Sequence, residues 1–324
     1  MLGALLSLLS AATFGMNVAT LRRGVLEGSV LQALAITVCA GVPLFAIACF
    51  FLGGFDALFG LSAEQLGWFA AAGIVHFIVG RYGNYRATRV LGAAQSGPIQ
   101  QISLLISLAL AMTFLGETLT TLSVIGILLT LLGPLVLLGN VARKGKVKTR
   151  AGQTLDYVDG YFWGIVCAIS FGISPLLIRF GLEEKSVAES VAGGLVSYAA
   201  GTVVILCILA LPGKIAHMRA MDRASAGWFT ATGVLVFISQ MLLYIALALA
   251  PVSIVAAVQR TGLVFRVVFS WMLNRDHEVL GLPAMIGIGV SALGVAAVTV
   301  NVEMLIEHVP LLAGIADILR IPWP

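Results

Sequence analysis

The sequence predicts an all-α membrane protein with ten transmembrane helices, arranged as two inverted-topology five-helix repeats. Apolar residues make up 60% of the 324 residues and charged residues only 10%, whereas soluble domains carry roughly a quarter charged residues. Several apolar runs exceed the ~18 residues that cross a bilayer. Residues 67–78 (GWFAAAGIVHFI) and 227–238 (GWFTATGVLVFI) are identical at seven of twelve positions, which indicates a duplicated unit.

Ten apolar runs are the predicted spans. They are continuous rather than alternating, which excludes a transmembrane β-barrel. Spans one to ten are, in chain order, 2–20, 31–52, 66–87, 93–115, 119–140, 160–179, 188–211, 226–248, 252–273 and 279–300. Span one lacks the positive residues that precede a signal-peptide core, and it aligns with span six, so we count it as a helix.

The most polar stretch of the chain divides it into parts. We predict a first five-helix repeat at 1–140, a basic linker at 141–159, a second repeat at 160–301 and a tail at 302–324. Trp323 suits a membrane interface. A short amphipathic helix on the membrane and a disordered segment are both compatible with the tail.

Identical residues recur between the repeats along nearly their whole length. The offset drifts from 157 to 161 residues, as short loop insertions would produce. The pairs are Gly3/Gly160, Phe14/Phe171, Gly15/Gly172, Arg22/Arg179, Gly24/Gly181, Glu27/Glu184, Ser29/Ser186, Val30/Val187, Tyr85/Tyr244, Ala87/Ala246, Gln100/Gln259, Glu117/Glu278, Gly126/Gly287 and Gly133/Gly294. Because each repeat holds five spans, an odd number, the two copies are predicted to cross the membrane in opposite directions.

Lysine and arginine predict the orientation. Thirteen of them lie in the loops after spans one, three, five, seven and nine, and three lie on the opposite side. Cytoplasmic loops carry the excess of positive charge. We therefore predict a multi-pass protein of the inner (cell) membrane, with the 141–159 linker in the cytoplasm and both termini outside.

The segment SGPIQQISLLISLALAMTFLGETLTTLSVIGILLTLLG at 96–133, with LGE at 115–117, resembles the fourth and fifth helices of the drug/metabolite transporter superfamily, in its EamA-type two-domain branch. The counterpart in the second half has no LGE. The resemblance implies a secondary transporter, often an exporter of amino acids, other metabolites or drugs. Such proteins are generally drawn with both termini in the cytoplasm, whereas the charges here predict the reverse.

Span nine holds the most informative polar residue, Arg260. It lies about nine residues into the span, or ~13 Å at 1.5 Å per residue, near the middle of a ~30 Å core. A guanidinium there costs at least ~2.5 kcal/mol, which indicates a water-filled cavity, a buried partner or a ligand. The aligned pairs Gln259–Arg260 and Gln100–Gln101 are therefore predicted to bind substrate. The alternative is an arginine that only joins helices through backbone carbonyls.

Two sites of predicted helix distortion accompany these residues. Gly97 and Pro98 precede the glutamine pair, and Pro175 lies in span six. Proline removes a helical hydrogen bond, so we predict broken or kinked helices whose backbone groups face a ligand. A kink that serves packing alone is the alternative.

Other polar residues recur at helical spacing and are predicted to line the same cavity, formed by spans one, three, four, six, eight and nine. They are His76 and Asn84 in span three, Gln240 and Tyr244 in span eight, and Asn17 and Ser174 at equivalent places in spans one and six. Each is equally consistent with an interhelical hydrogen bond. Arg81 and Arg266 are predicted gating residues near the cytoplasmic mouth. Glu117 and Glu278 are expected at solvated helix ends.

The absence of acidic residues deep in any span predicts the substrate class. Small multidrug antiporters need a membrane carboxylate, so we predict an anionic or carboxylate-bearing metabolite that moves by alternating access. No GxxxxGK[ST] motif is present, and no cofactor or metal site is predicted. The expected partners are a small-molecule substrate and the lipid bilayer, without nucleic acid, and a homodimer is left open. An intramembrane enzyme acting on a lipid-linked substrate and a non-transporting scaffold are the alternatives.

Overall fold

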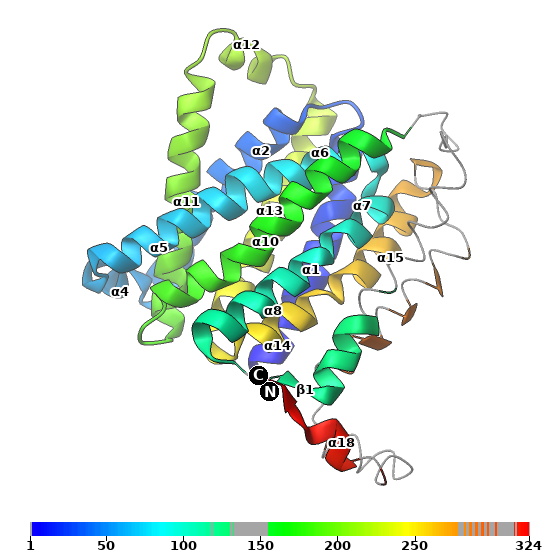
Figure 1. Ribbon diagram of the computed structural model, residues 1–324. Helices are drawn as coiled ribbons and strands as arrows, with labels where there is room; N and C mark the ends of the chain where they lie inside the picture. The colour runs from blue at the N-terminus through cyan, green and yellow to red at the C-terminus, as the bar shows by residue number, and fades with distance from the viewer. Residues whose placement is uncertain are drawn as a thin grey trace.

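A computed structural model shows a bundle of long helices that run alongside one another (Figure 1). The residues it describes are 2–117, 119–129, 132, 155–277, 282, 285–286, 289–290, 293–294, 297, 302, 314 and 316–323. Within them, eight helical stretches are long and apolar enough to cross a membrane: Leu2–Glu27, Val30–Leu52, Ala63–Leu91, Ala93–Leu115, Tyr157–Gly181, Val187–Leu209, Arg223–Leu249 and Val252–His277. The prediction of a helical multi-pass membrane protein is confirmed.

These eight stretches correspond to spans one to four and six to nine. Residues 121–129 of span five are also helical. Residues 130–131 and 133–140 of that span, the linker at 141–154 and most of span ten lie outside the described residues, so the count of ten stays a prediction.

Several spans are built from more than one helix. The first half contains α1 (Leu2–Gly24), α2 (Val30–Cys39), α3 (Gly41–Leu52), α4 (Gly54–Gly60), α5 (Ala63–Gly73), the π-helix η1 (Ile74–Gly80), α6 (Arg81–Leu91), α7 (Ala93–Gln100) and α8 (Ile102–Leu115). The second half contains α10 (Tyr157–Gly181), α11 (Val187–Leu209), α12 (Lys214–Arg219), α13 (Arg223–Leu249), α14 (Val252–Gln259), α15 (Gly262–Asn274) and the 3₁₀ turn η2 (Arg275–His277).

The tail returns to the bundle through a short strand pair. Helix α18 (Ala316–Arg320) leads into β2 (Pro322–Trp323), which pairs antiparallel with β1 (Leu119–Thr120) at the start of span five. Leu119 lies opposite Trp323 in this pair. The interfacial role of the tail stays a prediction.

Side-chain caps set where the helices begin, and they recur in both repeats. Ser29 and Ser62 begin α2 and α5, and Ser186 and Asp222 begin α11 and α13. Each side chain accepts a hydrogen bond from the backbone N–H three residues later, which satisfies a donor that the helix leaves open. The duplicated caps place the starts of equivalent helices at equivalent positions.

The core is built from contacts that the two halves exchange. The ring of Phe69 on α5 packs on Gly181 at the end of α10, and the ring of Phe229 on α13 packs on Gly24 at the end of α1. A Cβ on either glycine would overlap the ring, so glycine permits this close approach. The partners in the two contacts are related by the repeat, because Phe69 aligns with Phe229 and Gly24 with Gly181.

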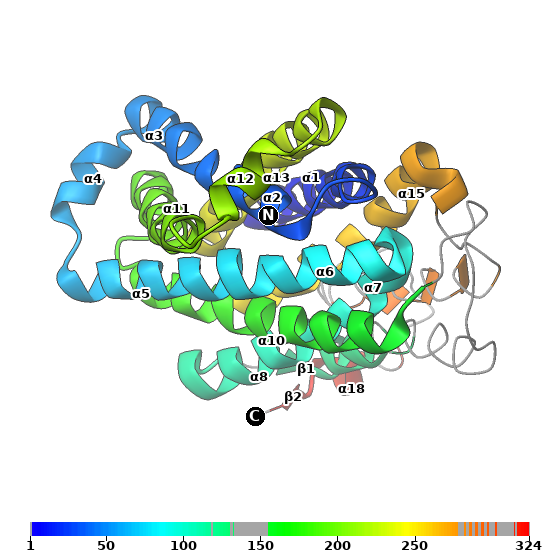
Figure 2. The ribbon, with the colours of Figure 1, turned by 90° about the horizontal axis from the view of Figure 1, so that it is seen from above.

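Two aligned arginines make equivalent contacts, each within its own half. Arg22 donates to the carbonyl of Thr88 at 3.2 Å, and Arg179 donates to the carbonyl of Leu247 at 2.8 Å. Arg22 aligns with Arg179 at an offset of 157, and Thr88 with Leu247 at 159. Each arginine therefore ties the first span of its repeat to the third. In Figure 2, the long helices of the two halves lie side by side, with α5 and α6 alongside α10.

Candidate functional site

Spans four and nine are each interrupted at one position. Helix α7 ends at Gln100 and α8 begins at Ile102, so Gln101 separates them. In span nine, α14 ends at Gln259 and α15 begins at Gly262, with Arg260 at the break. Gln101 and Arg260 are aligned by the repeat at an offset of 159. The α-helix is thus interrupted by a short turn at equivalent positions of the two halves, where Gln101, Arg260 and Thr261 keep right-handed φ and ψ values.

The residues of predicted helix distortion lie within helices. Gly97 and Pro98 lie inside α7, and the interruption of span four follows at Gln101. Pro175 lies inside α10, which continues to Gly181. Proline removes one hydrogen bond from a helix, so a kink at these positions stays a prediction.

The two broken spans meet at their breaks. Gln101 Nε2 donates to the carbonyl of Arg260 at 3.3 Å, and Arg260 Nη1 donates to the carbonyl of Gln100 at 3.2 Å and to Ser103 Oγ. Away from the breaks, α7 packs against α15 and α8 packs against α14 (Figure 1). The first part of each span therefore contacts the second part of the other, so the two spans run antiparallel.

A cavity of about 70 Å³ opens beside this crossing. Several water molecules would fit in it, because one water needs roughly 10–15 Å³ measured in this way. Its walls come from spans one, three, four, six, eight and nine. These are the spans that the sequence predicted to form the cavity. The predicted residues that line it are His76, Gly97, Gln100, Gln101, Pro175, Gln240, Gln259, Arg260 and Arg266.

Arg260, at the break in span nine, lines this cavity. Its Nε donates to the carbonyl of Ala256 at 3.2 Å, and Nη1 is engaged by span four. Nη2 makes no hydrogen bond with the described residues, and none of their carboxylates pairs with this arginine. The sequence left open whether Arg260 joins helices or lines a cavity. In the structure, Arg260 donates to Gln100 on span four and also lines the cavity.

Arg266 lies two turns further along the same span and is almost fully buried. Its guanidinium donates to Gln100 Oε1 at 3.1 Å, Thr88 Oγ1 at 3.0 Å and Ser96 Oγ at 2.9 Å, and Asn84 Oδ1 lies at 3.3 Å. This network ties span nine to spans three and four. Asn84 belongs to the network rather than to the cavity lining, and Arg266 belongs to both.

Another wall of the cavity carries the imidazole of His76 and the aromatic ring of Phe171. His76 lies in η1, and its Nδ1 forms a 2.6 Å hydrogen bond with Ser174 Oγ on α10. Its ring stacks on Phe171 with the centroids 4.3 Å apart. Single-turn π-segments inside α-helices occur frequently at functional sites. Ser174 therefore positions the imidazole without lining the cavity itself.

A third wall carries glutamine and serine. Gln259 Nε2 donates to Ser10 Oγ at 2.8 Å, and Ser10 Oγ donates to the carbonyl of Ser239 at 2.6 Å. Gln240 Oε1 is buried without a hydrogen-bond partner among the described residues. Because a buried amide oxygen without a partner is costly, it is available to a donor on a ligand. The sequence analysis did not single out Ser10 and Ser239, because serine is common in membrane helices.

Three predicted residues lie away from the cavity. Arg81 donates to Tyr198 Oη at 2.9 Å and packs over the Phe77 ring at 4.6 Å. Tyr244 is buried in the main core beside Phe45 and Phe69, and Asn17 is fully buried on α1. Helical spacing identified the correct helices but not which face meets the cavity.

Glu117 departs from the expected solvated helix end. Its two carboxylate oxygens accept hydrogen bonds from the backbone N–H groups of Val252 and Ser253, each at 2.9 Å. A carboxylate is favoured at a helix N-terminus by the open donors and the helix dipole. Pro251, the N-cap of α14, makes no side-chain cap, so Glu117 supplies the cap from the other repeat. Glu278, its aligned partner, lies outside the described residues.

The cavity is electropositive. Two arginines line it, and no Asp or Glu of the described part of the chain does so. Planar guanidinium groups bind carboxylates through paired hydrogen bonds. The described residues also contain no group of three His, Cys, Asp or Glu side chains that would hold a metal ion. The arrangement is suited to binding a small anion beside neutral amide and hydroxyl groups.

Comparison with known proteins places these features in context. The model of the EamA-like transporter family matches residues 1–139 and 158–300. No curated protein matches the sequence. One solved structure, described only as a crystal structure of a protein, is 18% identical with a TM-score of 0.60, and the match covers 92% of this chain and 96% of that chain. At this identity the likeness shows a shared fold alone.

Proposed function

Because the chain belongs to the EamA-like transporter family, within the drug/metabolite transporter superfamily, we propose that it is a secondary active transporter of a small polar metabolite. The substrate is anionic or bears a carboxylate, as amino and organic acids do. The charge of the cavity carries this proposal, since its lining includes Arg260 and Arg266, and no Asp or Glu of the described residues is part of that lining. A cavity lined by one sign of charge concentrates ligands of the opposite sign.

Within this site, Arg260 is the anion-binding residue. Its Nη2 lacks a protein acceptor among the described residues, whereas the Arg266 guanidinium is engaged by span three and span four side chains. Gln240 and Gln259 offer amide groups on a neighbouring wall, and His76 offers an imidazole. Arg266, whose guanidinium donates the hydrogen bonds of this network, is the gating residue. Arg81 does not line the cavity, and its guanidinium is held by Tyr198 in the core, so the proposed gating role rests on Arg266.

Alternating access is proposed from the relation of the repeats. Spans four and nine run antiparallel and cross at aligned breaks, and the halves exchange the Phe69–Gly181 and Phe229–Gly24 contacts. Contacts exchanged in this way follow a two-fold axis, and antiparallel equivalents put that axis in the membrane plane. Such inverted pairs bind substrate at the repeat interface and rock about it.

Export and a cytoplasmic linker complete the proposal. The resemblance to the family supports export as the direction of transport. Thirteen basic residues on the linker side against three on the other favour a cytoplasmic linker and outside termini in an inner membrane. A reporter fused after Pro324 that is active only in the cytoplasm is expected to stay silent, and its activity there would refute this topology.

Transport is tested with purified protein in proteoliposomes. We expect counterflow of radiolabelled amino acids or di- and tricarboxylates, and no accumulation of lipophilic cations. Arg260→Gln should weaken binding of the best substrate by roughly tenfold to a hundredfold, because a hydrogen bond to a charged group contributes about 1.5–3 kcal/mol. Arg86→Gln removes an equal charge from a residue paired with Asp159 on the surface, and is the matched control.

Three results would contradict the proposal. A preference for lipophilic cations would reverse the charge argument. Unchanged carboxylate binding in Arg260→Gln would remove the assigned residue. Chemical conversion of a lipid-linked substrate, without movement across the bilayer, would indicate an intramembrane enzyme.

A further inference from the structure

A second concave site lies at one end of the bundle, away from the central cavity. Its volume is about 420 Å³, and it lies where α6, the start of α2 and the α11–α12 connection meet. Four of its lining residues are basic: Arg86, Arg89, Lys214 and His217. Because α6 supplies the two arginines and α12 supplies Lys214 and His217, basic residues from two separate segments converge on one depression.

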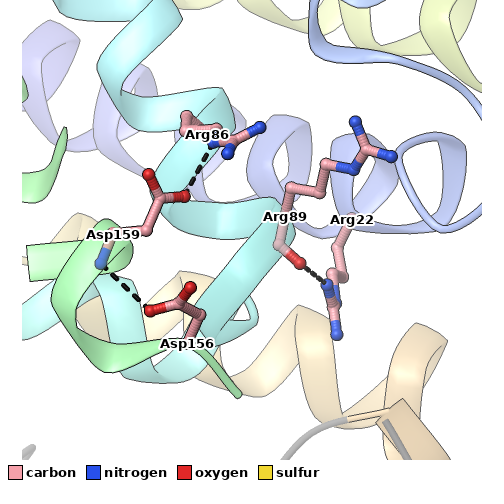
Figure 3. Close-up of polar contacts among 5 residues, drawn as sticks. All are labelled: Arg22, Arg86, Arg89, Asp156 and Asp159. Carbon is pink, nitrogen blue, oxygen red and sulfur yellow. Dashed lines mark hydrogen bonds and ion pairs between the residues drawn. The ribbon is translucent and has the colours of Figure 1, made fainter. Parts of the chain in front are cut away.

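The positive charge of this basic pocket is only partly neutralised. Asp159 accepts a hydrogen bond from Arg86 Nε at 2.7 Å, and Asp156 turns its own carboxylate to the backbone of Asp159. Figure 3 shows the Arg89 side chain pointing away from both aspartates, while only its backbone carbonyl contacts Arg22. Arg89 and Lys214 form no ion pair within the described residues, and residues 130–154 contain no Asp or Glu.

The pocket is also held in place. His217 Nε2 forms a 2.7 Å hydrogen bond with Ser29 Oγ, and Gln32 Nε2 donates to the carbonyl of His217 at 2.8 Å. These bonds fix the short α12 against the start of α2. The cationic groups are therefore gathered before any ligand arrives.

Exposed apolar residues border the pocket in the sequence, and we call them its apolar rim. Leu211 precedes the lining residue Pro212, Ile215 follows the lining residue Lys214, and both are 55% exposed. Tyr82, which lines the pocket, packs edge-on against Trp163 with the ring centroids 4.8 Å apart. Tyrosine and tryptophan are enriched where a membrane protein crosses the headgroup layer. Exposed aliphatic side chains beside a basic pocket suit a ligand with a charged head and a hydrocarbon tail.

We propose that the basic pocket binds the phosphate of an anionic phospholipid headgroup. Arginine fits phosphate oxygens through paired donors, and lysine does so as a point charge. The lipid tails then lie along Leu211 and Ile215. A free phosphate shares the headgroup chemistry but leaves the apolar rim uncovered. This site does not depend on the identity of the transported substrate.

The test measures lipid retention on the purified full chain by native mass spectrometry, with phosphatidylglycerol and phosphatidylcholine offered together. We expect selective phosphatidylglycerol adducts, and at least about a tenfold loss of affinity in Arg89→Gln/Lys214→Gln, because each basic residue near an anionic surface contributes about 1 kcal/mol. Arg219→Gln/Arg223→Gln removes the same charge from nearby exposed positions outside the pocket, and should retain the lipid.

Equal losses in both double variants would overturn the proposal, because they would reduce it to general surface charge. Displacement of the lipid by inorganic phosphate at equal concentration would also overturn it in favour of a soluble anion. A circular dichroism melt of each variant separates lost binding from lost folding. Should Arg89→Gln/Lys214→Gln fail to fold, the single variants Arg89→Gln and Arg219→Gln supply the same comparison, and Arg89→Gln should lose more of the adducts.

Discussion

The most direct prediction concerns the cap that Glu117 supplies to α14. In Glu117→Gln, one carboxylate oxygen that accepts from Val252 or Ser253 is replaced by an NH₂ group, which faces a donor. The change removes one charge-assisted hydrogen bond, about 1.5–3 kcal/mol, and a charge–dipole interaction of about 0.3–1 kcal/mol. The free energy of unfolding should therefore fall by roughly 2–4 kcal/mol.

The assay is equilibrium unfolding of purified protein in mixed micelles, followed by circular dichroism. Glu64→Gln is the matched control, because Glu64 lies exposed in the first turn of α5 and its carboxylate accepts only from the indole of Trp68, at 3.3 Å, among the described side chains. Its loss should stay near or below about 1 kcal/mol. If both variants unfold at the same denaturant activity, the cap contributes no more than a surface charge and the reasoning is refuted.

The other predictions concern packing in the core. Gly73→Ala should lower the melting temperature and the yield of folded protein, because its Cβ would overlap the Ser197 carbonyl, whereas Gly67→Ala meets nothing within 4 Å and should be neutral or stabilising. Tyr198→Phe should reduce the free energy of unfolding by about 1–3 kcal/mol, because it removes the hydroxyl that accepts from the buried Arg81 guanidinium. Unchanged unfolding of Tyr198→Phe in mixed micelles would show that water replaces the lost acceptor.

The organisation of the chain could be predicted from the sequence because duplication leaves a long record. Apolar runs report burial in lipid directly, since each run must cross a hydrocarbon layer of fixed thickness. The offset of about 160 residues also predicted which residues would occupy equivalent places, such as Gln101 and Arg260 at the two breaks. The membrane class and the family were accessible in this way.

Which residues line the cavity was harder to predict from the sequence, because it depends on which face of each helix points inward. His76 and Asn84 lie on one stripe of span three, yet only His76 reaches the cavity, since the Arg266 network holds Asn84. Arg81 carries the same intramembrane charge as Arg260 but is satisfied by Tyr198 in the core. The cap formed by Glu117 bridges 135 residues of sequence and has no local signal.

The two breaks lie at equivalent positions of the repeats, but the residues there differ in charge. The α-helix is interrupted at both Gln101 and Arg260, and both residues line the cavity. Only Arg260 is charged. If the charge alone sets the preference for carboxylates, its repeat of origin should not matter. Gln101→Arg placed in the Arg260→Gln background should then recover part of the lost carboxylate binding, measured by counterflow in proteoliposomes. Gln101→Lys should recover less, because lysine lacks the paired donors of a guanidinium. No recovery in a folded Gln101→Arg/Arg260→Gln protein would mean that anchorage to Gln100 and Ser103, and not charge alone, makes Arg260 the binding group.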